Sequence, residues 1–133
     1  MYEVKVYKVI REPLTSRYLL ILDSIDMTEE SVLIPIGKYE AENIHSRKCT
    51  GGKCKKSAYD VLSPILDAVE SVSFNKLVID NCDCGIYKAN LFLTSGGSDI
   101  KIDCRPSDGV ILAMDRQIPI FVKHPSECCE INN

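Results

Sequence analysis

The order in which strand-like and helix-like segments follow one another constrains the fold of this chain most. Seven segments either alternate in hydrophobicity or form short apolar runs between turn residues, as strands do. They are Tyr2–Ile10, Arg17–Asp23, Ser31–Ile36, Lys76–Asn81, Ile86–Thr94, Asp99–Cys104 and Pro119–Val122. Helices are predicted for Lys38–Arg47, for Ser57–Ser71 and from Pro106 onward. The order βββ-α-α-βββ-α-β lacks regular βαβ alternation and predicts an α+β domain with a mixed, mostly antiparallel sheet.

The length and composition fit one globular domain. The chain has 133 residues, of which 45% are hydrophobic and 26% are charged. These are the proportions of a domain that can bury a core of its own. We predict a single domain over residues 1–122 and a polar C-terminal tail over residues 123–133.

The two later helices are expected to be buried differently. The segment Ser57–Ser71 has an apolar stripe at helical spacing, formed by Leu62, Ile65, Leu66 and Val69. Pro64 lies inside this segment and should kink the helix or mark a restart. The run Val110–Met114 is apolar on every side, which predicts a helix inside the core.

The cysteines and the first residues indicate a cytoplasmic protein. The opening residues, MYEVKVYKV, have the pattern of a strand and not of a signal peptide. No stretch approaches the ~18 apolar residues that span a bilayer, so no membrane partner is expected. The seven cysteines are an odd number and cannot all pair within one chain, which favours reduced thiols.

Positive charge is concentrated in one short segment of an acidic chain. The formal net charge is −3, whereas residues 47–56, RKCTGGKCKK, carry five basic side chains and no acid. Nucleic-acid-binding domains commonly carry such a basic patch, so Lys48, Lys53, Lys55 and Lys56 are candidate phosphate contacts. The alternative is a solvated loop without a ligand.

Four cysteines offer a candidate zinc site. Cys49 and Cys54 are spaced C-x4-C, and Cys82 and Cys84 are spaced C-x-C in a turn. Structural zinc takes four Cys or His ligands, commonly from two close pairs. These cysteines would bind zinc if the basic loop folds over the turn. Free thiols, open to oxidation where they are exposed, are the alternative.

Several segments resemble one known family, in the order in which that family has them. VLIPIG at Val32–Gly37 precedes a helix start, and YDVL at Tyr59–Leu62 opens the second helix. IDCRPSDGVILA at Ile102–Ala113 leads from a strand into an apolar helix and is the most specific match. From residue 2 to residue 122 the chain resembles the bifunctional nuclease domain family. The resemblance implies a small intracellular α+β domain with nuclease activity on DNA and RNA.

The chain also departs from the pattern of that family. Tyr59 stands where a His is usual before the Asp of the second helix, and Gly109 stands where Ala is common. The chain has no Trp, although the family usually has one in its Pro-Ile-x-Ile-Gly segment. If the family His acts as a base or a ligand, this chain lacks that group.

The stretch from Asp103 to Asp108 contains the groups that phosphodiester hydrolysis requires. Such hydrolysis commonly uses carboxylates that hold a divalent cation and an activated water. Asp103 and Asp108 are therefore candidate ligands of magnesium or manganese, and Arg105 offers a fixed fork to phosphate oxygens. Ser107 could donate to phosphate or cap the helix. Glu40 and Asp60 also begin helices and could approach the same point.

The same residues have a structural interpretation. Arg105 could form an ion pair with Glu40 or Asp108, and Ser107 with Asp108 could cap a buried helix. Two hypotheses of function therefore stand. The first is a metal-dependent nuclease of low sequence specificity, and the second is a non-catalytic, dimeric binding or regulatory domain that keeps the fold.

Overall fold

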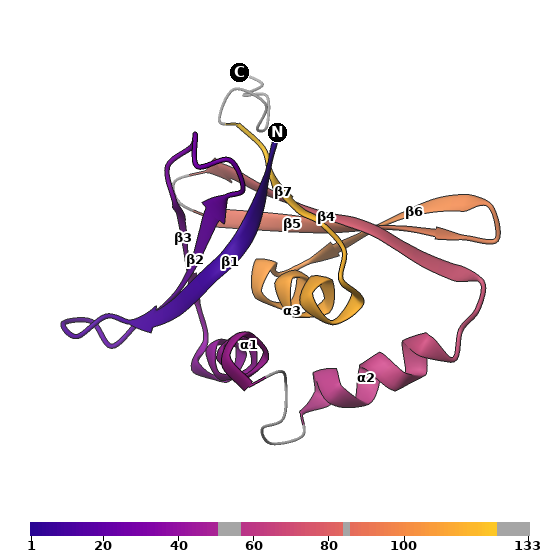
Figure 1. Ribbon diagram of the computed structural model, residues 1–133, viewed down its shortest axis with the longest axis horizontal. Coiled ribbons are helices and arrows are strands. Elements are labelled where there is room, and N and C mark those ends of the chain that lie inside the picture. Colours follow the sequence, from indigo (N-terminus) through magenta and orange to yellow (C-terminus); the bar gives the residue numbers. More distant parts are fainter. Residues whose placement is uncertain (51–56, 84–85, 125–133) are drawn as a thin grey trace.

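Seven strands and three helices make up the described part of the chain (Figure 1). The computed structural model describes residues 1–50, 57–83 and 86–124. The strands are β1 (Tyr2–Arg11), β2 (Tyr18–Ser24), β3 (Val32–Ile36), β4 (Val72–Asp83), β5 (Ile86–Ser95), β6 (Ser98–Cys104) and β7 (Ile120–Val122). The helices are α1 (Lys38–Thr50), α2 (Ala58–Asp67) and α3 (Pro106–Arg116). This order confirms the predicted α+β class and element sequence.

The strands form one mixed sheet in the order β3-β2-β1-β7-β4-β5-β6. Strands β1 to β3 form one antiparallel group, and strands β4 to β6 form another. The short strand β7 joins the two groups, because it pairs antiparallel with β1 and parallel with β4. The helices lie on one side of the sheet (Figure 1). The predicted mixed, mostly antiparallel sheet is confirmed.

The core lies between the sheet and the helices. Large apolar side chains with no solvent exposure come from both strand groups and from α1 and α3: Leu20, Leu22, Ile44, Leu77, Ile79, Val110 and Ile111. Gly109 lets α3 approach the sheet closely, because a Cβ there would lie 2.5 Å from Cδ1 of Leu77. The prediction that this apolar helix lies in the core is confirmed. Over the described ranges, no helix is both long enough and apolar enough to cross a membrane.

Two elements, α2 and β4, differ most in length from the sequence prediction. Helix α2 ends at Asp67, and Pro64 lies inside it without a restart. Strand β4 begins at Val72 and not at Lys76. The reason is tertiary, because Val72 and Phe74 pair with β5 and the register then shifts before Lys76.

The turn between β5 and β6 has the chemistry of a tight hairpin. Gly96 and Gly97 both have positive φ, at 58° and 85°. Two consecutive residues with positive φ are what a two-residue type I′ turn requires, and glycine adopts that backbone without strain. This turn pairs Ser95 with Ser98 and so fixes the register of β6 on β5.

Candidate functional site

Arg105 lies where β6 meets α3 and forms a bidentate ion pair with the first turn of that helix. Nε of Arg105 donates to Oδ2 of Asp108 at 2.7 Å, and Nη2 donates to Oδ1 at 2.9 Å. Nη2 also donates to Oε2 of Glu40 at 3.2 Å. The Arg105 side chain is 63% exposed, whereas those of Asp108 and Glu40 are 27% and 12% exposed. The guanidinium is therefore the accessible member of the group.

The first turns of all three helices meet at this guanidinium. Glu40 comes from α1, Tyr59 from α2 and Asp108 from α3. The Tyr59 hydroxyl donates to Oδ1 of Asp108. Burial, together with this hydrogen bond to a carboxylate, raises the pKa of Tyr59 above its ordinary value. Tyr59 thus stays protonated at neutral pH and acts as a donor, so it cannot take the role of a histidine base.

The Asp108 carboxylate is held in its charged form. Burial acts to raise the pKa of Asp108, but the hydrogen bonds from Arg105 and Tyr59 outweigh it, and the pKa lies below its ordinary value. The same bond with Asp108 raises the pKa of Arg105. The cluster therefore keeps a fixed cation between two carboxylates, which is the structural ion pair that the sequence offered as an alternative.

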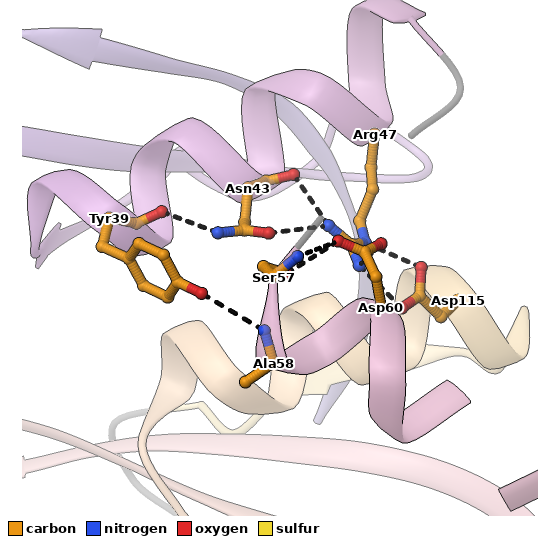
Figure 2. Close-up of polar contacts among 7 residues, drawn as sticks. All are labelled: Tyr39, Asn43, Arg47, Ser57, Ala58, Asp60 and Asp115. Atoms are coloured by element: carbon orange, nitrogen blue, oxygen red, sulfur yellow. Dashed lines mark hydrogen bonds and ion pairs between the residues drawn. The ribbon is translucent and has the colours of Figure 1, made fainter. Parts of the chain in front are cut away.

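A second, buried polar network ties the helices to one another (Figure 2). The Arg47 side chain is only 6% exposed. It donates to both oxygens of Asp115, at 2.7 and 3.0 Å, and to Oδ1 of Asp60 at 3.1 Å. It also donates to the side chain of Asn43 at 3.1 Å. Arg47 belongs to α1, Asp60 to α2 and Asp115 to α3, so one guanidinium links three helices.

Asp60 belongs to this Arg47 network and not to the Arg105 cluster. The backbone N–H and the hydroxyl of Ser57 both donate to Oδ2 of Asp60 at 2.8 Å, which completes a capping box at the start of α2. Both carboxylate oxygens thus have structural partners. Sequence reasoning placed Asp60 correctly at a helix start, but the spacing gave no sign of Arg47 or Asp115.

Asp103 and Ser107 lie near Arg105 in sequence but differ in environment. Asp103 is exposed on β6, and its neighbour Cys104 lies on the helix side against Gly109. Successive strand residues alternate between faces, so Asp103 points to the face away from α3 and from Asp108. Ser107 is 4% exposed at the second position of α3. The structure brings Glu40, Arg105 and Asp108 together and leaves Asp103 outside that cluster.

An open cavity of about 580 Å³ lies beside Arg105. It is lined by the start of β2, by the end of β3, by Arg105 directly after β6, and by the residues that begin α1 and α3, including Gly37, Lys38, Pro106 and Ser107. Three of its lining side chains are basic: Arg17, Lys38 and Arg105. Helix N-termini carry free backbone N–H groups and favour anions. Sequence reasoning missed Arg17 and Lys38, because neither lies in a motif and the cavity forms only when distant segments meet.

A comparison with family models supplies the remaining observation. The model of the bifunctional nuclease domain matches residues 20–125, most of the chain. The chain belongs to the bifunctional nuclease domain family. A comparison with curated proteins gave no match. The match covers all three helices of this bifunctional nuclease domain, and so the Arg105 cluster lies inside it, as does the lining of the cavity apart from Ser16, Arg17 and Tyr18.

Two carboxylates beside Arg105 bear on the predicted metal site. Within residues 1–50, 57–83 and 86–124, no group of three His, Cys, Asp or Glu side chains could hold a metal ion. Magnesium commonly takes only one or two carboxylates, with substrate phosphate and water completing its shell. Glu40 and Asp108 both reach Nη2 of Arg105, so both could reach one cation near that position if Arg105 moved away. Among the residues that the structure describes, Glu40 and Asp108 are thus the two carboxylates that could bind one divalent cation. The predicted ligand Asp103 does not lie with them.

The predicted basic and cysteine sites fall largely outside the described residues. Lys53, Lys55, Lys56, Cys54 and Cys84 lie there, and nothing is described of the Cys82 side chain. Lys48 is exposed near the end of α1, about 15 Å along the helix from Lys38 at its start. Cys49 is exposed, with its Sγ 3.6 Å from Nδ1 of His45. The zinc site stays a prediction.

Proposed function

We propose that this bifunctional nuclease domain hydrolyses phosphodiester bonds in DNA and RNA with low sequence specificity, and that it binds phosphate in the cavity beside Arg105. The observation that carries the proposal is the meeting of three basic side chains at one open cavity next to two helix N-termini. This supports binding of an anion through its charge and shape alone. Contacts of that kind position a nucleic acid without reading its bases.

Arg105 is the residue on which the proposal rests. Its guanidinium offers a planar fork that matches two phosphate oxygens, and it is already oriented by Asp108. A phosphate that enters the cavity must compete with Glu40 for the Arg105 guanidinium. The single Arg105–Glu40 contact, at 3.2 Å, is longer than the contact of 2.7 Å between Arg105 and Asp108. Lys38 lines the same cavity and adds charge. Asp108 then acts as a positioning residue that holds Arg105 in place.

Magnesium or manganese belongs to the proposal as the suspected cofactor. Glu40 and Asp108 are the residues that would hold it. A bound divalent cation would supply charge neutralisation and an activated water. Because both carboxylates are engaged by Arg105, that guanidinium would have to give up at least one of them.

The test is a cleavage assay on mixed-sequence DNA and RNA, with magnesium or manganese and again after EDTA. We expect EDTA to abolish cleavage and Arg105→Ala to lower kcat/KM at least about tenfold, the loss of roughly one charge-assisted hydrogen bond. Arg116→Ala is the matched control, because it removes the same charge at the other end of α3. Cleavage that persists after EDTA and is equal in both variants would remove this mechanism.

A second candidate is a non-catalytic, homo-oligomeric binding or regulatory domain. It is favoured by the neutralisation of Arg105 between two carboxylates and by protonated Tyr59 at the position of the family His. Thermal denaturation of Arg105→Ala decides between the two. A large fall in melting temperature, with no cleavage by the parent protein, would support the second candidate. A cytoplasmic location remains part of both proposals.

A further inference from the structure

Strand β6 is an open edge of the sheet. It pairs with β5 on one side and has no strand of the described chain on the other. The two-residue turn makes Ser95 and Ser98 a hydrogen-bonded pair, so the backbone groups of Ser98, Ile100 and Ile102 face β5. Those of Asp99, Lys101 and Asp103 consequently face outward. The opposite edge, β3, contains Pro35, which cannot donate a hydrogen bond to another strand.

The side chains of β6 extend the apolar surface past this edge. Ile100 and Ile102 are paired with Leu93 and Leu91, which are buried on the helix side of the sheet. Ile100 and Ile102 themselves are 38% and 45% exposed. Helix α2 lies on the same side of the sheet and leaves Ile65 56% exposed (Figure 1). The edge therefore combines free backbone groups with uncovered apolar side chains.

The charges on β6 select how it can pair with a copy of itself. Charged edge strands often resist pairing, because like charges then lie opposite each other. A two-fold axis at Lys101 would do this, since Lys101 would face itself and Asp99 would face Asp103. An axis at Ile100 instead places Asp99 opposite Lys101 of the second copy, twice, and Ile100 opposite Ile100. An axis at Ile102 also pairs opposite charges. It moves the second copy toward the Cys104 end of β6, where Arg105 follows and contacts Glu40 and the cavity.

We propose that β6 pairs antiparallel with β6 of a second copy of this chain, with the two-fold axis at Ile100. The two sheets then become one continuous sheet across the interface. Opposite-charge pairs form on the open face, and isoleucines pack on the helix face. Stable dimers commonly bury about 800 Å² from each partner. Ile100 and Ile102, which are 38% and 45% exposed, add apolar area to that of the paired backbones.

The test is the mass of the full chain in solution, measured by sedimentation equilibrium over a range of concentrations. We expect twice the chain mass of 14.9 kDa. Lys101→Asp should weaken the dimer at least tenfold, since it places two like-charge pairs across the axis. The double variant Asp99→Lys with Lys101→Asp should restore it. Lys5→Asp, the same charge change at an exposed position of β1, should leave it unchanged.

Three results would overturn the proposal. A chain that stays monomeric at 100 µM has no such interface, and a dimer indifferent to Lys101→Asp uses another surface. Restoration of Lys101→Asp by Asp103→Lys in place of Asp99→Lys would move the axis to Ile102. Circular dichroism of each variant confirms that it is folded before its mass is interpreted.

A second measurement is independent of charge. At the axis, Ile100 forms a non-hydrogen-bonded pair with itself, with Cα atoms about 4.5 Å apart, within reach of a disulfide. Ile100→Cys, with the six native cysteines other than Cys104 changed to serine, should crosslink when oxidised glutathione is added. Leu33→Cys in the same background, 48% exposed on the other edge, should not. Equal crosslinking of both would overturn the proposed pairing.

Discussion

At the scale of single residues, Asp108 gives the clearest dependence on pH. Its pKa in the folded protein lies below the ordinary value, chiefly because Arg105 and Tyr59 outweigh the effect of burial. A group with a lowered folded pKa stabilises the fold above its unfolded pKa, about 3.9 for Asp, and loses that contribution as the pH falls through the folded value. Asp108→Asn should therefore cost about 1 kcal/mol at pH 7, a figure reduced for partial exposure to solvent.

The measurement is urea denaturation of the parent protein and of Asp108→Asn between pH 7 and pH 2. The difference in unfolding free energy should be constant from pH 7 to about pH 5 and should shrink below about pH 4. Glu3→Gln, which changes an exposed carboxylate on β1, is the control. A difference that grew on acidification would contradict the assignment of Asp108 as the charged partner.

The sequence predicted part of the Arg105 cluster and missed the rest for a physical reason. Arg105 and Asp108 are three residues apart at a Pro-started helix, so their pairing follows from local geometry. Glu40 was named as a partner because it too begins a helix. Tyr59 and Lys38 were not assigned to this site, since their contacts depend on how three helices are placed on the sheet. That placement is a tertiary property that no short motif encodes.

At the scale of elements, the Arg47 network holds the helices together more than apolar packing of α2 does. Leu62, Ile65 and Leu66 of the predicted apolar stripe lie on α2, whereas Val69 lies beyond its end, and no residue of this helix is buried. Its contacts with the other helices are largely polar: Asp60 with Arg47, Tyr59 with Asp108 and Asp67 with Arg116. The amphipathic pattern predicted the helix correctly, but it could not indicate that an ion-pair network anchors it.

Removing Arg47 should therefore destabilise the whole protein. Arg47→Ala leaves Asp60 and Asp115 without their shared cation in a site where Arg47 is 6% exposed, at a cost of about 3 kcal/mol. Urea denaturation measures this loss. Arg17→Ala, in which the lost side chain is 54% exposed and bound to Glu12, should lose far less. Equal losses in the two variants would contradict the assigned role of the network.

At the scale of the whole molecule, the candidate site depends on the curvature of the sheet. Strands β3 and β6 are the two edges of a seven-stranded sheet, yet the end of β3 lines the same cavity as Arg105, the residue that directly follows β6. Sheets twist, and bulges such as the register shift between Val6 and Lys8 increase the twist locally. The sequence predicted which strands exist, but their spatial order and the meeting of the two edges arise only from long-range pairing.

Strand β7 holds the sheet together, because its three residues pair with both strand groups. Ile120 is 6% exposed and lies opposite Val4 on one side and Leu77 on the other. Ile120→Ala should cost about 2–5 kcal/mol, the range for a buried aliphatic residue cut to alanine. Leu33→Ala, on an exposed edge, should cost far less.

Since α1 and α3 also contact one another, we expect the two strand groups to unfold together. Circular dichroism and fluorescence of the six tyrosines should then give one coincident urea transition, in the parent and in Ile120→Ala. Two separate transitions would mean that the strand groups are independent units and that the cavity, lined by the end of β3 and by Arg105 after β6, is not fixed by the fold.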